Sequence, residues 1–437
     1  MDENLVETEF KYSHGEINTP FSFAKKMIDM FPPEFLRENH KWLDPGCGQG
    51  NISYTLYNSL CKYHNKDKIL KEMIHMVEIN KERENAIRNR FENKPFLNIN
   101  IVDFMDFNET GFDAIICNPP FNFGGCIKTP TNKSNTKKND GYTAWCKFIT
   151  HSMTLLRENG YLCIIVPSMW LKPDKAGMYY YLLQYKIEKM MFFTNTETNH
   201  IFRGQAQTPT TLFLLKKQQS KERILSLFCN EKREYIKYAL KKDFPIPTTN
   251  FVLINKLMEY VNKVGHIKVF KTNMPSKFVS FSLTSSEDFK YKNIKTVITH
   301  KNKESATTND TFETMNGIIA EKHVNWSDKP CIGYNRPKII LAHKMYGYPL
   351  LDIKGEYGIS NRDNFIITEY NEQELERIAQ FLSLPFIIKI YDATRYRMRY
   401  LEKYAFNFIP DITKLQDFPF DDFTEESVKA YFKVSNL

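Results

Sequence analysis

Two consecutive prolines, Pro119 and Pro120, directly follow the apolar run 112-FDAIIC-117, and they limit what this part of the chain can form. Proline fixes φ and has no N–H group, so neither residue can continue a hydrogen-bonded ladder. A strand in this run must therefore end at Cys117. In an open α/β sheet, ligands bind outside the carboxyl ends of the strands. The rigid turn 118-NPPF-121 is thus either part of an active site or an ordinary loop punctuated by proline.

A glycine-rich stretch follows an earlier predicted strand. The strand is expected at 41-KWLD-44, the glycines lie in 45-PGCGQGN-51, and apolar residues with helical spacing begin at Ile52. Glycines let the backbone approach a ligand closely, and the first N–H groups of the following helix point towards that ligand. This unit predicts a ligand at the turn, although a short glycine pattern alone also occurs in simple turns.

The next two predicted strands both end in an acidic residue. Glu78 lies near the end of 73-MIHMVEI-79, at a distance from the glycines that suits a carboxylate bound to a ribose diol. Asp103 ends the strand 98-NINIVD-103, and Phe104 follows it, which offers an acceptor for an exocyclic amine and a ring for a purine. Either acidic residue alone is also explained as a helix cap or salt-bridge partner. Their order predicts a nucleoside-containing ligand along one edge of the sheet.

Strands and helices continue to alternate as far as residue 217. A helix is expected at 143–156, and strands at 161–167, 189–194 and 209–217, the last two as an antiparallel hairpin at a sheet edge with a polar loop between them. The sequence therefore predicts an α/β fold with seven strands and helices on both faces. Residues 127–141 hold four lysines and Ile127 as their one large apolar residue, so they are expected to be either a mobile lid or a segment without fixed structure.

Charge is distributed unevenly along the chain. Residues 201–350 hold 25 Lys and Arg against 12 Asp and Glu, whereas residues 1–200 hold 24 of each and residues 351–437 hold 11 against 15. A basic block is expected of a protein that binds a polyanion, and it also occurs on solvated lysine-rich surfaces.

Cysteine spacing and apolar runs exclude several classes of protein. The eight cysteines show no CxxC pair, which argues against a zinc site or a disulfide framework, so no metal is predicted. No apolar run is long enough to span a bilayer, and the acidic start 1-MDENLVETEF-10 lacks the apolar segment of a secretory signal. We therefore expect a soluble protein without a membrane partner.

The motifs resemble those of the S-adenosylmethionine-dependent amino-methyltransferases of DNA, and their order is similar to that of the gamma class, typified by the TaqI methyltransferase. The resemblance covers about residues 14–217 and rests on 14-HGEINTP-20, 43-LDPGCGQG-50, 118-NPPF-121 and residues 142–171. It implies a Rossmann-like, seven-stranded methyltransferase domain at 1–217. A linker at 218–243 and a mixed α+β DNA target-recognition domain at 244–437 would follow.

The resemblance also implies S-adenosylmethionine as the cofactor and S-adenosylhomocysteine as its product. Thr19 and Pro20 would contact the methionine part of the cofactor, and Glu78 would hold the ribose hydroxyls. Asp103 would accept a hydrogen bond from the adenine amine, with Phe104 and Trp145 near that ring. The full set of implied cofactor-binding residues is Thr19, Pro20, Asp44, Gly46, Gly48, Glu78, Asp103, Phe104 and Trp145.

The catalytic residues implied by the motif are Asn118, Pro119, Pro120 and Phe121. The exocyclic amine of adenine is conjugated with the ring, so its lone pair is a poor nucleophile. The Asn118 side-chain oxygen and the Pro119 carbonyl would each accept one amine hydrogen and draw the nitrogen towards tetrahedral geometry, because the prolines hold both acceptors rigidly. Phe121 would stack on a base flipped out of the duplex.

Further contacts with DNA are predicted on both sides of residue 217. The resemblance gives Phe202 as a second stacking ring, although a core position explains this residue as well, and Arg203 is expected near a phosphate. In the basic block, Arg336, Lys338 and Lys344 are predicted to contact DNA. The run 395-RYRMRY-400 is either a DNA-facing stripe or an exposed helix face.

The function predicted from the sequence is methylation of adenine N6 in a specific duplex DNA sequence, in a restriction-modification or viral host-evasion system. A monomer is expected in the cytoplasm of a bacterium or of an infected host cell, with double-stranded DNA as partner and a separate cognate restriction endonuclease as a candidate partner. Cytosine-N4 methylation usually has Ser in place of Asn118. RNA adenine-N6 or protein-glutamine methylation is the alternative enzyme function, and a non-catalytic nucleic-acid-binding module is the third hypothesis.

Overall fold

The computed structural model describes residues 17–121, 144–173, 177–221, 223–282, 288–300, 311–313, 319–343, 348–397 and 401–435. The chain divides into two compact units, Met1–Asp243 and Phe244–Leu437. Within the described ranges, no helix has the length and apolar character needed to cross a membrane. The same ranges contain no disulfide and no cluster of three or more potential metal ligands.

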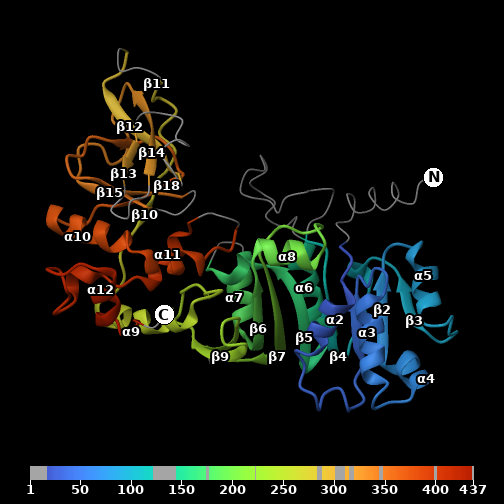
Figure 1. Ribbon diagram of the computed structural model, residues 1–437. Helices are drawn as coiled ribbons and strands as arrows, with labels where there is room; N and C mark the ends of the chain where they lie inside the picture. The colour runs from blue at the N-terminus through green and yellow to red at the C-terminus, as the bar shows by residue number, and fades with distance from the viewer. Residues whose placement is uncertain are drawn as a thin grey trace. The chain divides into compact units, whose positions relative to one another are not determined.

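The first unit is built around a nine-stranded sheet in the order β3-β2-β1-β4-β5-β7-β6-β8-β9 (Figure 1). The pairs β1–β2, β2–β3, β1–β4 and β4–β5 are parallel, and β7 runs antiparallel to both β5 and β6. The strands are β1 (Trp42–Pro45), β2 (Ile74–Glu78), β3 (Asn98–Ile101), β4 (Phe112–Cys117), β5 (Leu156–Pro167), β6 (Tyr185–Phe193), β7 (Thr210–Gln219), β8 (Ile224–Cys229) and β9 (Glu234–Ala239). The predicted mixed α/β fold with a large sheet is confirmed.

The predicted number of seven strands is wrong for this sheet. Strands β8 and β9 add to it, and both lie in residues 218–243, which were expected to be a linker. The side chains of Leu225 and Leu227 are buried, whereas most residues of β9 are partly or fully exposed. An edge strand that buries so little has a polar composition, which explains why its sequence looked like a linker.

The predicted edge hairpin is also different in the structure. Strand β7 lies between β5 and β6, and β8 covers the other side of β6 in parallel, so neither predicted hairpin strand is at the edge. A helix, α8 (Asn195–Ile201), replaces the expected polar loop between them. It begins with a capping box, in which Thr194 Oγ1 accepts from the Glu197 N–H at 3.2 Å and Glu197 Oε2 accepts from the Thr194 N–H at 2.7 Å.

The helices of this unit pack around the sheet (Figure 1). Besides α8 they are α2 (Phe21–Ile28), α3 (Asn51–Leu60), α4 (Lys66–Lys68), α5 (Arg83–Arg90), α6 (Ala144–Leu155) and α7 (Met178–Leu183), with short turns at Ile69–Met73, Phe104–Asp106 and Ser168–Leu171. Strand β1 is buried along its whole length, and the Trp42 ring packs 4.8 Å from that of Phe31.

The order in which successive strands are added to the sheet reverses at β1. The chain passes from β1 to β2 and β3 on one side, then crosses to β4 on the other side of β1. Because all these strands are parallel, the residues after β1 and those after β4 lie at the same edge. This topology places the glycine turn beside 118-NPPF-121, at the crevice where open α/β sheets bind ligands.

The second unit contains two smaller sheets with helices. The four-stranded sheet has the order β10-β18-β15-β16, and the five-stranded sheet follows β11-β14-β12-β17 with β13 paired to β14. Its strands are β10 (Phe270–Lys271), β11 (Phe281–Ser282), β12 (Tyr291–His300), β13 (Thr311–Glu313), β14 (Ile319–Ser327), β15 (Lys338–Ala342), β16 (Pro349–Asp352), β17 (Gly358–Ile359) and β18 (Asn364–Ile367). Its helices are α9 (Phe251–Val264), α10 (Glu372–Leu382), α11 (Pro385–Asp392) and α12 (Glu425–Tyr431), with 3-10 turns at Lys403–Phe408 and Ile412–Lys414.

Candidate active site

The glycine turn after β1 is held against the end of β2. The N–H groups of Gly46 and Cys47 donate to the Val77 carbonyl at 2.8 and 3.0 Å. Gly46 has φ +71°, and a Cβ built on it would lie 3.5 Å from the Phe148 ring. A side chain at this position would therefore strain the backbone and fill the space between the turn and α6. The turn keeps its backbone accessible at close range, as the sequence predicted.

Glu78 lies beside this turn at the end of β2. Its Oε2 accepts from the Gly48 N–H at 2.7 Å, and its Oε1 accepts from the Asn80 N–H at 2.8 Å. The side chain is buried, so these two bonds fix the carboxylate next to the glycines. Each carboxylate oxygen can accept more than one hydrogen bond, which leaves capacity for the hydroxyl groups of a ligand.

Asp44 is buried at the start of the turn with one oxygen satisfied and one not. Its Oδ2 accepts from the Ser53 hydroxyl at 2.7 Å and from the Ser53 N–H at 3.2 Å, while Oδ1 has no hydrogen-bond partner among the described residues. Burial raises the pKa of Asp44 to about 7; the bonds from Ser53 oppose the rise and the charge of Glu78 adds to it. A buried carboxylate oxygen without a donor is a place where a cationic or hydrogen-bonding ligand group would be stabilised.

Asn118 follows β4 and is bonded to the segment that precedes α2. Its Nδ2 donates to Thr19 Oγ1 at 3.0 Å and to the Ile17 carbonyl at 3.4 Å. A carbonyl can only accept, so turning the amide over would place Asn118 Oδ1 against the Ile17 oxygen. The amide orientation is therefore fixed, and Oδ1 faces away from these two partners.

A second asparagine, for which the sequence predicted no role, holds the segment before α2 to the glycine turn. Asn51, the first residue of α3, donates from Nδ2 to the Thr19 carbonyl and to Asn18 Oδ1, both at 2.8 Å. Its own Oδ1 accepts from the Arg90 guanidinium. Asn51 thus links α5, α3 and the segment at 17–19. The sequence feature that could have identified Asn51 is its position directly after the last glycine of the turn.

Asp103 was predicted to end the strand, but β3 ends at Ile101, so both Asp103 and Phe104 lie after it, and Phe104 points inward. Asp103 is exposed, and its Oδ1 caps the short turn at Phe104–Asp106 by accepting from the Met105 N–H at 2.9 Å. The Phe104 ring is buried 4.9 Å from that of Phe148. Trp145 is buried too, and its Nε1 has no hydrogen-bond partner within the described ranges.

One family model matches part of this unit. Residues 23–202, less than half of the chain, match the family of Eco57I restriction-modification methylases. This segment is therefore similar to the methylases of that family. Gamma-class membership and the particular likeness to the TaqI methyltransferase stay predictions.

Individual relatives match either a short part of this chain or a longer part at low sequence identity. A predicted type II restriction enzyme and methyltransferase of Methanocaldococcus jannaschii is 44% identical over 62 residues, which are 14% of this chain and 5% of that protein. The methyltransferase subunit of a type I restriction-modification system from Streptococcus thermophilus is 19% identical to this chain, with a TM-score of 0.37. The match covers 54% of this chain and 53% of that subunit. A type I modification subunit from Vibrio vulnificus is 15% identical over 55% and 54% of the two chains, with a TM-score of 0.38. The chain thus spans only part of the length of these relatives.

The two predicted stacking residues of the first unit have different surroundings. Phe121 ends the described part of the proline turn, and its ring is buried. Phe202 is buried in the core at the end of α8, where its ring lies 5.5 Å from that of Phe23. The core position, which was the alternative explanation for Phe202, is the one observed, so its ring offers no stacking face in this structure. Arg203 is exposed with φ +51°.

The predicted cationic DNA contacts in the second unit also differ among themselves. Arg336 is exposed, whereas Lys338 is 0% exposed and forms an ion pair with Asp352. Asp352 in turn accepts from the N–H groups of Glu356 and Tyr357 at 2.9 and 3.1 Å, so the pair holds a turn together. The prediction that Lys338 contacts DNA is therefore wrong. Lys344 lies outside the described residues, as do residues 127–141.

The described part of the run 395-RYRMRY-400 is not an exposed helix face, and the DNA-facing stripe stays a prediction. Arg395 Nε pairs with Asp392 Oδ1 at 2.9 Å, and Tyr396 is buried with its hydroxyl donating to the Ile246 carbonyl at 2.7 Å. No helix covers residues 395–397, and residues 398–400 lie outside the described ranges.

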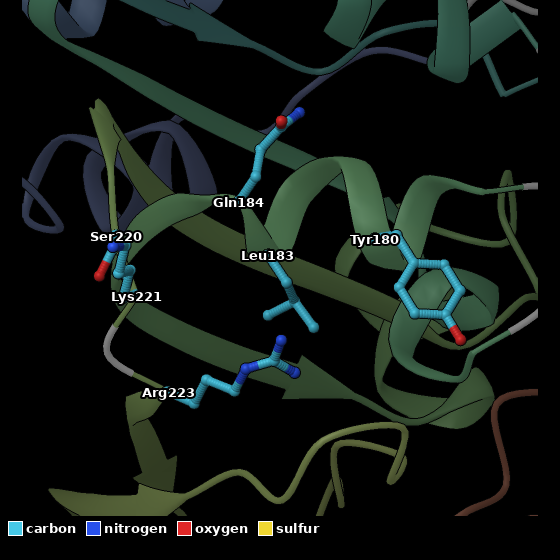
Figure 2. Close-up of a pocket in the computed structure, with 6 residues that line it drawn as sticks. All are labelled: Tyr180, Leu183, Gln184, Ser220, Lys221 and Arg223. Atoms are coloured by element: carbon cyan, nitrogen blue, oxygen red, sulfur yellow. The ribbon is translucent and has the colours of Figure 1, made fainter.

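A cavity of the first unit lies away from these residues (Figure 2). It is formed by side chains from α7 and from the segment after β7, and Figure 2 shows Arg223 extending towards Leu183. The lining residues are Tyr180, Leu183, Gln184, Ser220, Lys221 and Arg223. Gln184 precedes the amino end of β6, which runs parallel to β5, so the cavity is at the opposite edge of the sheet from the glycine turn. It does not belong to the candidate active site.

Proposed function

We propose that the first unit transfers the methyl group of S-adenosylmethionine to the exocyclic N6 of an adenine flipped out of duplex DNA. The observation that carries this proposal is the fixed amide of Asn118. Its Nδ2 is occupied by Thr19 and Ile17, and its Oδ1 has no hydrogen-bond partner among the described residues. An acceptor held in this way at the end of β4 suits an amine N–H of the target base.

The residues around the glycine turn fit the cofactor. Glu78 would accept from the ribose hydroxyls, since its carboxylate is already fixed by the Gly48 and Asn80 N–H groups. The unpartnered Oδ1 of Asp44 would receive a donor from the methionine part, and Gly46 leaves room for the ligand beside Phe148. When bound, the cofactor would supply an electrophilic methyl group on a positively charged sulfur. Asp103, Phe104, Trp145 and Pro20 stay predicted contacts.

The proline turn would prepare the amine for attack on that methyl group. Asn118 Oδ1 and the Pro119 carbonyl would each accept one N6 hydrogen, which favours a tetrahedral nitrogen with its lone pair directed away from both acceptors. The same oxygens would stabilise the positive charge that develops on nitrogen as the new N–C bond forms, because they are held in place beforehand. The methylated ammonium would then lose a proton to water, so no general base is needed. Phe121 would support the flipped base.

The second unit would recognise the DNA target. This part of the proposal is supported by the basic surplus of residues 244–350, which hold 15 Lys and Arg against 8 Asp and Glu, and by exposed cations such as Arg336 and Arg362, with Lys338 excluded because it is buried. Phosphate contacts of this kind would fix the register of the unit on the duplex. The monomeric state, the cytoplasmic location and a separate cognate endonuclease stay predictions.

The test is to incubate the protein with cofactor that carries a tritiated methyl group and with duplex DNA, then to identify the labelled nucleoside. The expected product is N6-methyladenine. Label in N4-methylcytosine would contradict the choice of base, and label only in RNA or in protein glutamine would establish the alternative enzyme function. Cofactor binding without transfer to any of these substrates would support the non-catalytic hypothesis.

A further inference from the structure

The segment between β10 and β11, residues 272–280, presents large apolar side chains to solvent; we call it the connector. Phe278 is 82% exposed and Met274 is 62% exposed, the highest values among the large apolar side chains that the structure describes. Phe270 and Phe281 flank the connector and are also exposed. Single exposed apolar residues are ordinary, but several on one short segment indicate an interaction site.

The connector is fixed at both ends, so these side chains are presented by an anchored backbone. At one end Thr272 is buried, and its hydroxyl lies 2.6 Å from the Asn361 carbonyl and 3.0 Å from that of Asn364. At the other end the Ser280 N–H donates to Asp328 Oδ1 at 2.9 Å, and the Asp328 N–H donates to the Ser280 carbonyl at 3.3 Å.

The two anchors belong to different sheets of the second unit. Strand β10 pairs with β18 in the four-stranded sheet, and β11 pairs with β14 in the five-stranded sheet (Figure 1). Between them a turn forms, in which the Val279 N–H donates to the Ser276 carbonyl at 3.1 Å. An apolar surface that is already held in place loses little conformational entropy when a partner binds.

The charges around the connector are mainly positive. Lys271 and Lys277 are exposed within or beside it, and the sequence from 265 to 295 holds six lysines, at positions 268, 271, 277, 290, 292 and 295, against Glu287 and Asp288. Lys268 pairs with Glu369 at 3.5 Å, whereas no ion pair is found for Lys271 or Lys277 among the described residues. Docking two copies through this surface would bring like charges together. A partner that combines anionic groups with flat apolar surfaces fits better.

We propose that the connector binds duplex DNA, with Phe278 and Met274 against the base pairs and Lys271 and Lys277 on phosphates. Apolar side chains of these types can insert between base steps and partly unstack them, while neighbouring cations hold the backbone. The choice of DNA rests on the proposed function, and it adds exposed apolar side chains to the basic block, for which the sequence predicted only cationic contacts. The connector would thereby contribute to deforming the duplex around the target.

The test compares single variants of the full chain in binding to a fluorescein-labelled, random-sequence duplex. Phe278→Ala is expected to weaken binding about 10-fold, in the range of losing one aromatic contact with a base, and Phe278→Trp is expected to retain it. Lys277→Ala should reduce the slope of log affinity against log salt by about one. Ile224→Ala removes an exposed apolar side chain of β8 in the first unit and should leave binding unchanged. Cofactor affinity, which checks folding, should be equal in all four variants.

The outcomes separate this proposal from the proposed function. If the wild-type protein methylates DNA but Phe278→Ala and Met274→Ala bind the duplex normally, the connector proposal is wrong and the function stands. If the wild-type protein binds the duplex without methylating it, and Phe278→Ala weakens this binding, the connector proposal stands. Two further results would overturn it: concentration-dependent dimerisation that Phe278→Ala abolishes, or sedimentation with phosphatidylserine vesicles in place of DNA binding.

Discussion

Three residues of the first unit that were predicted to belong to one site are bonded at the glycine turn or beside it, whereas the cations predicted to share one role in the second unit have different environments. Thr19, Glu78 and Asn118 come from three separate parts of the chain: Glu78 accepts from Gly48, and Thr19 accepts from both Asn51 and Asn118. Arg336 and Lys338 are two residues apart, yet one is exposed and the other is buried against Asp352. Strand topology determines the first arrangement, while composition alone says nothing about which face a side chain takes.

The strongest test of the first unit is Asn118→Ala. Removing the oriented amide eliminates one of the two acceptors for the amine, so methyl transfer should fall by about 1000-fold or more. Cofactor affinity should stay within about twofold of the wild type, because loss of transition-state stabilisation does not require loss of ground-state binding. Single-turnover transfer and equilibrium binding of S-adenosylhomocysteine check the two parts. Normal turnover in this variant would disprove the role of the amide.

The matching test of the second unit is Lys338→Ala. Removing one partner of a buried ion pair leaves Asp352 uncompensated, which should lower the free energy of unfolding by about 3–5 kcal/mol. Urea unfolding measures this change, and Lys338→Met combined with Asp352→Asn, which keeps an oxygen acceptor for this turn, should recover most of the loss. If Lys338→Ala is as stable as the wild type but binds DNA more weakly, Lys338 contacts DNA after all.

Thr19→Val tests whether the segment before α2 positions Asn118. The substitution keeps the shape but removes the oxygen that accepts from Asn118 Nδ2, so the maximal rate should fall about 10- to 100-fold at saturating cofactor. Thr19→Ser retains the hydroxyl and should restore most of the rate. If Thr19 only bound the cofactor, the rate at saturation would be unchanged and only the cofactor KM would rise.

Cofactor binding should depend on pH through Asp44. Because burial raises the pKa of Asp44 to about 7, the carboxyl is partly protonated in the free protein near neutrality. A cationic ligand group at Oδ1 favours the ionised form, so affinity for S-adenosylhomocysteine should fall about 10-fold between pH 8 and pH 6. Asp44→Asn should bind more weakly with a flatter pH profile. An unchanged profile in Asp44→Asn would assign the pH dependence to another group.

The stability of the ligand-free protein should follow the opposite trend. The folded pKa of Asp44 lies above its usual value of 3.8, so the native state retains a proton that the unfolded chain has lost. The contribution of Asp44 to stability is therefore fully present below pH 3.8 and is lost as the pH rises towards 7.

The smallest expected effect is that of Arg336→Ala. An exposed cation that contacts one phosphate should contribute a few-fold in DNA affinity, and its loss should reduce the salt slope by about one. Fluorescence anisotropy at several salt concentrations measures both quantities. An unchanged slope would show that Arg336 does not face DNA. The basic composition of this part of the chain would then not have predicted its DNA contacts.

Parts of the fold were predictable because they depend on local pattern. The strands that end at Pro45, Glu78 and Cys117 are short, buried and followed by turn residues, so their ends were predicted to within one residue. Strand β9 was missed, since a mostly exposed edge strand carries no clear apolar alternation, whereas β8 was missed although it is mostly buried. Phe202 was ambiguous because an aromatic residue after a helix suits a core and a binding face equally.

What the sequence determined by itself is the order of chemical groups along the parallel strands: glycine turn, Glu78, Asp103 and Asn118. Parallel strands bring their carboxyl ends to one edge, so this order was enough to predict a shared site. Only the tertiary structure decided which atoms are already engaged, because hydrogen bonds such as Asn118 to Ile17, and ion pairs such as Lys338 to Asp352, join residues whose proximity depends on the packing of whole elements. Burial and orientation are properties of the folded chain, and no local pattern records them.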